Sequence, residues 1–270
     1  MNRLEAIFAD TKAHNRAALI PYICAGDPSP LLTVPLMHAL VDAGADILEL
    51  GIPFSDPMAD GPVIQRATER ALVHNVSLHD VLEMVMDFRR QDQLTPVVLM
   101  GYANPIEAMG LDHFAKAAAS AGVDAVLTVD YPAEEAQAVT DALKAEGLAN
   151  IFLVSPTTPV AREQNILQQA GGFLYYVSLR GVTGAKMIDT SEVERKVSEL
   201  KAQTDLPIGV GFGIRDAETA HKMAQFADAV VVVSALVQTI ESVVALGDAV
   251  ILSAAQAFIR DIRAGLNRAA

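Results

Sequence analysis

Three acidic side chains lie within or shortly after a short apolar segment, and they are well placed for acid–base chemistry. Glu49 lies inside the apolar run at residues 47–52, and Asp56 and Asp60 follow in a loop that contains Pro and Gly. A carboxylate among apolar side chains is costly unless it is paired or its pKa shifts. We therefore expect a functional role for Glu49, whereas Asp56 and Asp60 could equally cap turns or pair with a nearby Lys or Arg.

Three segments in the second half of the chain have features of an anion site. Residues 178–186 and 209–214 contain several glycines, and Ser234 in residues 231–237 could cap a short helix. Glycine lets backbone N–H groups approach an anion closely, and a helix N-terminus adds a partial positive charge. Each segment alone is more typical of a tight turn. Together they predict a phosphate site held mainly by backbone dipoles, because Lys and Arg do not cluster.

The histidines are poorly placed for catalysis, and no His, Asp or Glu cluster has the spacing of a metal site. All six histidines fall on or beside expected helices: His14, His38, His74, His79, His113 and His221. The general acid or base must then be a carboxylate or a tyrosine, and Glu49 is the strongest candidate. A partly apolar setting would raise its pKa by desolvation, so that it exchanges a proton near neutrality. Asp60 could stay ionised and face a developing positive charge.

The scaffold that positions these groups shows as eight short apolar segments that alternate with helical ones. The expected strands are residues 17–26, 47–51, 96–102, 125–130, 151–155, 173–178, 207–213 and 229–234. Strands that are apolar on both faces are typical of parallel sheets buried on both sides. Eight strand–helix units predict a (β/α)8 TIM barrel. An open doubly wound sheet would usually carry Gly-x-Gly-x-x-Gly after its first strand, where this chain has AGDPSP.

The helical segments complete this barrel as one domain over residues 1–270. We expect an additional N-terminal helix at 3–14 and extra helices after strands two and eight. Single helices are expected at 106–120 and 133–145. No linker or low-complexity segment divides the chain.

The loops after the strands of such a barrel meet at one face, where the chemistry takes place. The residues expected there are Tyr22, Glu49, Asp60, Met100, Tyr102, Asp130, Tyr175, residues 181–184, Phe212, Gly213 and Ser234. Tyr22, Met100 and Phe212 could form the walls around a flat aromatic substrate.

Composition limits the class of partner and the compartment. The formal net charge of −13 argues against a nucleic-acid partner, because phosphate backbones are bound by basic surfaces. The single cysteine, Cys24, fits a reducing compartment and excludes a disulfide framework. No segment reaches the ~18 apolar residues that a membrane span needs, and the N-terminus lacks the apolar core of a signal peptide. We predict a cytoplasmic protein without a membrane partner.

Several motifs resemble the tryptophan synthase alpha chain family, in order and over nearly the whole chain. They are PYICAGDP (21–28), LELGIPFSDPMADGPVIQ (48–65), LMGYANPI (99–106), SLRGVTGA (178–185) and GFGI (211–214). The resemblance implies a barrel that cleaves indole-3-glycerol phosphate to indole and glyceraldehyde 3-phosphate by a retro-aldol reaction. It implies that the alpha chain uses no cofactor for this cleavage. It also implies a PLP-dependent beta chain as partner in an α2β2 complex.

The same resemblance implies roles for individual residues. Glu49 falls on the acid/base that moves protons between the indole carbon and the side-chain hydroxyl. Asp60 falls on the carboxylate that meets the indole N–H, and Thr183 is expected to close over the substrate and reach Asp60. Asp56 is expected to face the beta chain. The other expected substrate contacts are Tyr22, Met100, Tyr102, Tyr175 and Phe212, and the expected phosphate contacts are Gly184, Gly213 and Ser234.

The chain also departs from the family pattern. Tyr22 and Met100 stand where the family often has Phe and Leu, and Val233 stands where it usually has Gly, directly before Ser234. A β-branched residue restricts the backbone and crowds an anion, so we hypothesise weakened phosphate binding. Alternatively, the strand end is shifted outward and nothing is lost.

Two other functions remain as alternatives. One is another phosphate-binding barrel, such as a sugar-phosphate isomerase or the synthase that makes indole-3-glycerol phosphate. That synthase would normally show a catalytic Lys at a strand end, and none is evident. The other is a non-catalytic subunit that binds the phosphate ligand and regulates its partner.

We also predict that the loops at 53–60 and 178–190 are mobile gates.

Overall fold

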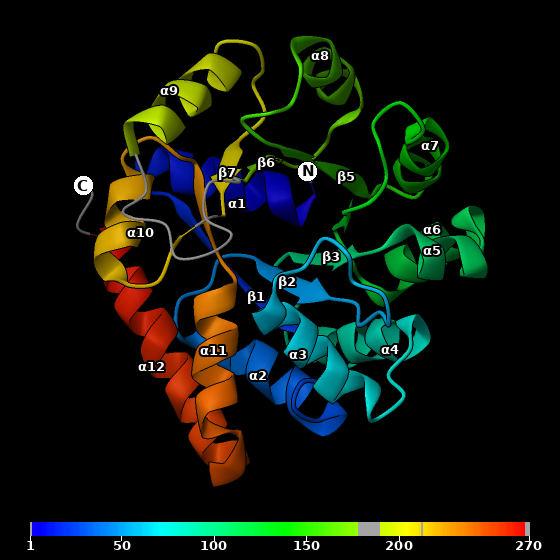
Figure 1. The fold of residues 1–270 in the computed structure, drawn as a ribbon, viewed down its shortest axis with the longest axis vertical. Coiled ribbons are helices and arrows are strands. Elements are labelled where there is room, and N and C mark those ends of the chain that lie inside the picture. The colour runs from blue at the N-terminus through cyan, green and yellow to red at the C-terminus, as the bar shows by residue number, and fades with distance from the viewer. Residues whose placement is uncertain (1, 178–189, 212, 268–270) are drawn as a thin grey trace.

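Eight parallel strands close into a barrel in the computed structural model, which describes residues 2–177, 190–211 and 213–267 (Figure 1). Each strand pairs with the next in sequence, and β8 pairs with β1. The strands are β1 (Ala18–Cys24), β2 (Leu48–Gly51), β3 (Val97–Gly101), β4 (Ala125–Thr128), β5 (Ala149–Val154), β6 (Leu174–Tyr176), β7 (Ile208–Val210) and β8 (Ala229–Val232). The predicted TIM barrel is confirmed.

Helices surround this barrel, and the additional ones lie where they were predicted. The helix α1 (Arg3–Ala13) precedes β1, α3 (Pro62–Leu72) and α4 (Leu78–Arg89) follow β2, and α11 (Ser234–Val243), η1 (Val244–Leu246) and α12 (Asp248–Asn267) follow β8. The others are α2 (Pro30–Asp42), α5 (Ala103–Met109), α6 (Leu111–Ala121), α7 (Gln137–Ala145), α8 (Val160–Gln169), α9 (Thr190–Lys201) and α10 (Ala217–Ala224). None of the described helices is both long and apolar enough to cross a membrane.

Several predicted boundaries were wrong. The single helix expected at 106–120 is two helices, because Gly110 has φ +87° and both ends α5 and precedes α6. The helix expected at 133–145 begins only at Gln137. Strands β4, β6, β7 and β8 end two or three residues before their predicted ends. Ser234 is consequently the first residue of α11, and Val233 rather than Ser234 takes the N-cap position.

Side chains of the strands alternate between two apolar layers, which explains why the strands are apolar on both faces. The layer inside the barrel includes Ala18, Ile20, Ile47, Val98, Leu127, Ile151 and Val231. The layer between the strands and the helices includes Leu19, Ile23, Leu48, Leu50, Val97 and Leu99. Glu49 lies between Leu48 and Leu50, so its side chain shares the inner face with Ile47.

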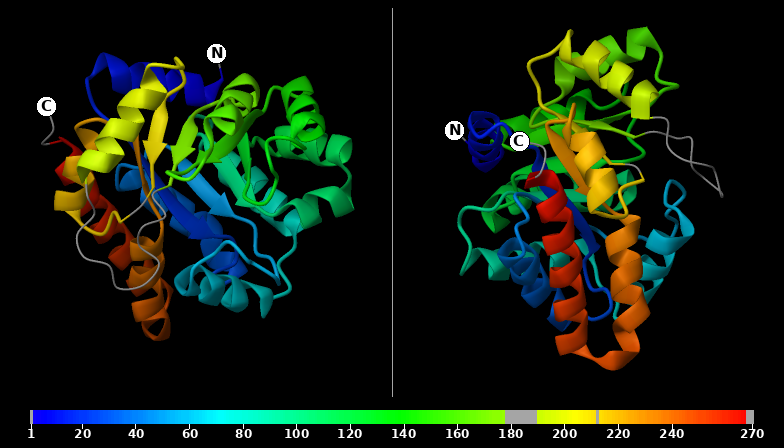
Figure 2. Two further views of the ribbon diagram at one scale, coloured as in Figure 1. Left: turned by 45° about the horizontal axis from the view of Figure 1, so that its top comes forward. Right: turned by 90° about the vertical axis from the view of Figure 1, so that its left-hand side faces the viewer.

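The amino ends of the strands are covered by α1. Leu4 and Phe8 of this helix pack into the inner layer, and the ring of Phe8 lies 5.8 Å from that of Phe173. The right-hand view of Figure 2 shows α1 on one side of the barrel and the loop between β2 and α3 on the opposite side. The described loops after the strands therefore surround the other end, the mouth of the barrel.

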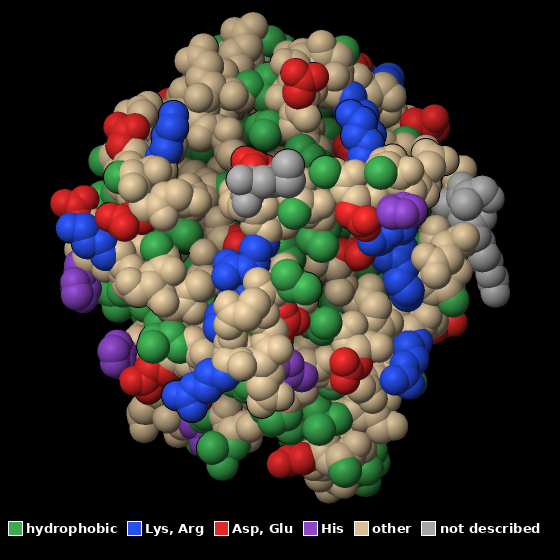
Figure 3. Space-filling view, turned by 180° about the vertical axis from the view of Figure 1, so that it is seen from behind, with side chains coloured by type: hydrophobic (Ala, Val, Ile, Leu, Met, Phe, Trp, Pro, Cys, Tyr) green, Lys and Arg blue, Asp and Glu red, His purple; other side chains and the backbone are tan. Residues whose placement is uncertain are grey.

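Three aspartates hold the amino ends of neighbouring strands together. Asp46, Asp124 and Asp228 each stand just before a strand. Each carboxylate accepts a backbone N–H of the preceding strand at 2.8 Å, from Leu19, Val97 and Ile208 respectively. Each also pairs with a cation: Asp46 with Arg16 and Arg263, Asp124 with Arg3 and Arg89, and Asp228 with Lys201. Figure 3 views the side on which α1 lies and shows acidic and basic side chains interspersed over it.

Candidate active site

Glu49 is a buried carboxylate without a hydrogen-bond partner. Its Cα is in register with Tyr22 of β1 and Val98 of β3, and only 1% of the residue is exposed. Neither carboxylate oxygen has a hydrogen-bond partner among the described residues. Burial raises the pKa of Glu49 to about 8, because desolvation disfavours the charged form. The predicted upward shift is confirmed, and the group is mainly protonated at neutral pH.

Two tyrosines flank this carboxyl group. A Cβ atom added to Gly51 would lie 2.2 Å from the hydroxyl oxygen of Tyr22, and one added to Gly211 would lie 2.2 Å from that of Tyr175. Burial is the main cause that raises the pKa of each tyrosine, and the charge of Glu49 adds to it in both. The structure thus brings Tyr22 and Tyr175 together beside Glu49. The sequence analysis did not identify Gly51, and it did not connect Gly211 with a tyrosine. The signal that could have done so is a glycine at an inward-facing position of a barrel strand, where it leaves room for a tyrosine ring.

Asp60 is held by an aromatic pair that spans two loops. The hydroxyl group of Tyr102 donates to Asp60 Oδ2 at 3.0 Å and accepts the backbone N–H of Ala59 at 3.1 Å. The ring of Tyr102 stacks on Phe54 with 5.2 Å between centroids. Burial raises the pKa of Asp60, and the hydrogen bond from Tyr102 works against that rise. Tyr102, expected only as a substrate contact, therefore also fixes the Asp60 carboxylate. Sequence reasoning did not identify Phe54.

Met100 lies between the inner layer and Tyr22. It is partly buried and packs against both the barrel-lining cluster and the cluster that contains Tyr22. Its Cα is in register with Gly51. The structure thus brings two of the three predicted wall residues together, and the third, Phe212, lies outside the described residues.

The expected phosphate end is only partly described. Gly213 has φ +70°, a conformation that favours glycine, and Ser234 is exposed at the first turn of α11. Among the described residues no side chain caps this helix, and free N–H groups at a helix N-terminus are what an anion binds. Val233 turns the chain from β8 into α11 and packs against the apolar cluster that contains Tyr22. Thr183, Gly184 and the gate expected at 178–190, apart from Thr190, lie outside the described residues.

Asp56 stands apart from the other acids. It is exposed, and it accepts a 2.6 Å hydrogen bond from the hydroxyl group of the neighbouring Ser55. Nothing in the described part of the chain joins it to Glu49 or Asp60.

The six histidines lie on or beside helices as predicted, and the described residues contain no His, Cys, Asp and Glu group that could hold a metal.

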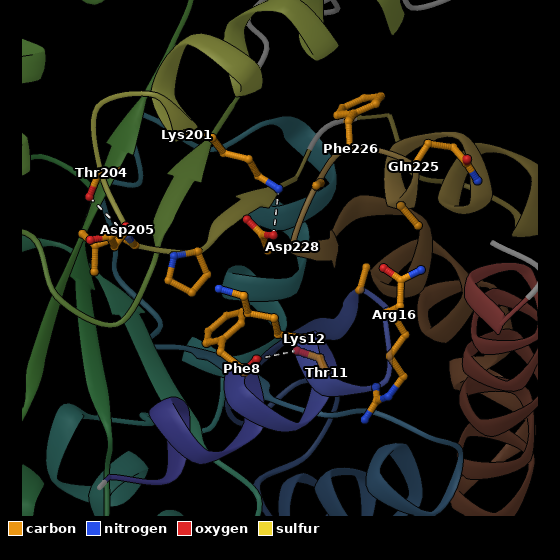
Figure 4. A pocket seen from close by; sticks show the side chains of 16 residues that line it. Phe8, Thr11, Lys12, Arg16, Lys201, Thr204, Asp205, Gln225, Phe226 and Asp228 are labelled. Atoms are coloured by element: carbon orange, nitrogen blue, oxygen red, sulfur yellow. Dashed lines mark hydrogen bonds and ion pairs between the residues drawn. The ribbon is translucent and has the colours of Figure 1, made fainter. Parts of the chain in front are cut away.

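A separate cavity of about 440 Å³ lies at the amino end, between α1 and the segments before β7 and β8 (Figure 4). Phe8, Pro207 and Phe226 form part of its wall. Lys201 donates to Asp228 across it at 2.8 Å, and Asp228 also accepts from the barrel backbone. Lys201 and Asp228 are thus paired with each other, and the other carboxyl group of the lining belongs to the exposed Asp205, so the described lining holds no buried carboxyl group without a partner like the one at the mouth.

Comparisons with known proteins all identify the same family. The family model described as tryptophan synthase alpha chain matches residues 8–265. A tryptophan synthase alpha chain of Thiobacillus denitrificans is 62% identical over 242 residues, which are 90% of this chain and 89% of that one. The alpha chain of Hydrogenovibrio crunogenus is 54% identical over 269 residues, or 100% and 99% of the two chains.

Solved structures agree with the sequence relatives. Tryptophan synthase subunit alpha from Legionella pneumophila superposes with a TM-score of 0.93 at 48% identity, covering 99% of both chains. A chain of tryptophan synthase from M. tuberculosis, in an aminoacrylate-bound form, superposes with a TM-score of 0.87 at 36% identity. That match covers 98% of this chain and all of the other (100%).

Proposed function

The chain belongs to the tryptophan synthase alpha chain family, and on that premise we propose that Glu49 and Asp60 carry out its reaction. The protein is a lyase of L-tryptophan biosynthesis that cleaves indole-3-glycerol phosphate to indole and glyceraldehyde 3-phosphate. The observation that carries the proposal is the buried carboxyl group of Glu49, which has no hydrogen-bond partner in the described part of the chain and a pKa of about 8. Such a group is protonated at neutral pH and can still give up its proton.

Glu49 acts first as an acid and then as a base. Its carboxyl group protonates the indole carbon that bears the glycerol phosphate chain, which leaves the ring as an iminium-like cation. The Glu49 carboxylate then takes the proton of the side-chain hydroxyl group as the carbon–carbon bond breaks. The electron pair of that bond returns to the ring, so indole and the aldehyde leave while Glu49 is protonated again. Because Glu49 accounts for both proton transfers, we propose that this half needs no cofactor.

Asp60 stabilises the intermediate. Its carboxylate accepts the indole N–H and faces the positive charge of the protonated ring. The hydrogen bond from Tyr102 supports this role because it favours the ionised form of Asp60 and fixes its direction. The remaining substrate contacts are Tyr22, Met100, Tyr102, Tyr175, Thr183 and Phe212, and the phosphate contacts are Gly184, Gly213 and Ser234.

Membership of the family implies a beta chain as partner. We propose that this beta chain depends on PLP, that the assembly is α2β2 and that Asp56 lies at the interface. Exposure of Asp56 and of the nearby Met58, which is 78% exposed, supports this surface. We further propose that residues 1–270 form one barrel domain and that the protein acts in the cytoplasm.

Replacement of one carboxyl group tests the mechanism. Glu49→Gln keeps the shape but cannot exchange a proton, so we expect indole release from indole-3-glycerol phosphate to fall about 10³-fold. The assay is run with and without a beta chain. Glu83→Gln, at an exposed glutamate on α4, is the control and should match the wild type. A Glu49→Gln protein as active as this control would remove Glu49 from the acid/base role.

A further inference from the structure

Three segments meet at a single guanidinium group, that of Arg70 on α3. Its Nε and Nη2 atoms donate to the two carboxylate oxygens of Asp27 at 2.6 and 2.9 Å. Its Nη1 atom donates to Glu241 at 2.8 Å. A planar guanidinium group that binds one carboxylate with two parallel bonds fixes direction as well as distance.

Each of these segments leads directly to a residue of the proposed site. Asp27 follows β1, which carries Tyr22 near its end. The helix that carries Arg70 begins two residues after Asp60, and the helix that carries Glu241 begins at Ser234. Figures 1 and 2 show α3 and α11 side by side. Arg70 thus links the segments that carry three residues of the proposed site. Ser234 is the contact at the phosphate end, and Tyr22 and Asp60 are the contacts at the indole end.

A small apolar cluster fills the space between these supports. Ala67 and Ala71 of α3 and Val237 of α11 are buried in one cluster with Tyr22, and Ile64 and Cys24 complete it. The two alanines are fully buried, so α3 approaches β1 closely. Close-packed contacts of this kind transmit a shift of either helix to the Tyr22 ring.

Arg66 provides an internal comparison on the same helix. It donates to both oxygens of Glu241 at 2.7 Å, but its side chain is 48% exposed and, among the described residues, it makes no hydrogen bond to the segment that follows β1. The Asp27 side chain bound by Arg70 is only 3% exposed. Exposed ion pairs contribute little, whereas breaking a buried pair leaves a charge without compensation. The bond that matters for the arrangement is therefore the one between Arg70 and Asp27.

We infer that Arg70 is a positioning residue that sets the separation between the phosphate end and the indole end of the substrate site. This inference rests on the proposed roles of Tyr22, Asp60 and Ser234. A substrate that spans both ends is sensitive to their separation, because small misplacements lower the rate strongly. A fragment that occupies one end is not.

The experiment compares the whole substrate with two fragments in Arg70→Met and in the matched control Arg66→Met. For Arg70→Met we expect KM for indole-3-glycerol phosphate to rise about tenfold. The dissociation constants of inorganic phosphate and of indole, measured by calorimetry, should each stay within about twofold of the wild type, because each probe occupies one end only. Arg66→Met should leave all three values within about twofold.

Two results overturn the inference. One is that Arg70→Met behaves like Arg66→Met. The other is that the fragments weaken as much as the substrate, which indicates a general loosening of the barrel. Since Arg70→Met leaves Asp27 buried without its cation, the Asp27→Asn/Arg70→Met double variant is measured in parallel. It should likewise show a raised KM for indole-3-glycerol phosphate and unchanged dissociation constants for phosphate and indole. Arg70→Lys, which cannot bind Asp27 with two parallel bonds, should restore KM only in part.

The same assays separate this inference from the proposed function. If Glu49→Gln is inactive while Arg70→Met is normal, only the positioning role fails. If Glu49→Gln is fully active, the proposed mechanism fails. The comparison of phosphate and indole binding still reports on Arg70 in that case, because it does not depend on turnover.

Discussion

At the mouth of the barrel one buried carboxyl group has no partner among the described residues, whereas the three aspartates at the amino end are all paired. At the amino end, Asp46, Asp124 and Asp228 each accept a backbone N–H and pair with Lys or Arg. At the mouth, Glu49 is 1% exposed, against 5% for Asp124, but it has no partner among the described residues. The amino end uses charge to hold strands together. The mouth keeps a carboxyl group that destabilises the fold when it ionises, and this is what a proton-transfer group requires.

The largest loss of stability is expected at Asp124, the most buried of the three aspartates. Asp124→Asn keeps an acceptor for the Val97 N–H but leaves Arg89, which is itself buried, without its anion. We expect the free energy of unfolding to fall by about 3 kcal/mol, measured by urea denaturation. Asp228→Asn is the matched control and should cost less than ~1 kcal/mol, because that side chain is 36% exposed. Equal losses at the two positions would contradict the role of burial.

Replacing Glu49 should raise the free energy of unfolding rather than lower it. Its pKa is about 8 in the folded chain and about 4.5 when unfolded, so the folded chain holds a proton that the unfolded chain loses as pH rises between these values. Stability is fully present below pH 4.5, decreases through this window and levels off above about pH 8. Glu49→Gln removes that decrease, so at pH 8 we expect it to be more stable than the wild type by about 4 kcal/mol. Urea midpoints measured from pH 4 to pH 9 test this, and a constant difference over that range would contradict it.

The pH dependence of the wild-type rate follows from the same pKa. The first proton transfer needs a protonated Glu49, so kcat/KM should fall as pH rises through about 8. The measurement is indole release between pH 6 and pH 10. A profile that is flat over this range would show that another group supplies the first proton.

Much of the barrel follows from short-range patterns, whereas the pairing of its polar groups does not. Eight apolar segments were sufficient to predict the barrel, and Glu49 was identifiable because an acid among Leu48, Leu50 and Ile52 has no local partner. Gly110 was not recognised as a helix break, because a single glycine within a helical pattern is often tolerated. The bond between Tyr102 and Asp60 joins residues 42 positions apart, so it depends on how the loops after β2 and β3 meet.

The hydrogen bond from Tyr102 to Asp60 can be removed without touching either carboxyl group of the mouth. Tyr102→Phe removes the only hydroxyl group that the described structure places on the Asp60 carboxylate, and it also frees the Ala59 N–H. We expect kcat/KM to fall about tenfold with the fold intact, because the hydrogen bond directs a charge that acts in the transition state. Tyr131→Phe, which loses a bond to Glu107 on the surface, is the control and should change the rate less than about twofold. Similar losses in both variants would argue against a role for the Tyr102 hydroxyl group.

The smallest effect is expected where the mouth departs from the family pattern. Val233 occupies the N-cap position of α11, and its side chain packs against the apolar cluster that contains Tyr22, so it is part of the apolar wall as well as a neighbour of the phosphate end. Val233→Gly would relieve crowding of the anion, and we expect KM for indole-3-glycerol phosphate to fall about threefold. It would also remove apolar contacts, so the free energy of unfolding should drop by about 1 kcal/mol. An unchanged KM with the expected loss of stability would mean that the shifted strand end already accommodates the phosphate, and that Val233 serves only the packing of this apolar cluster.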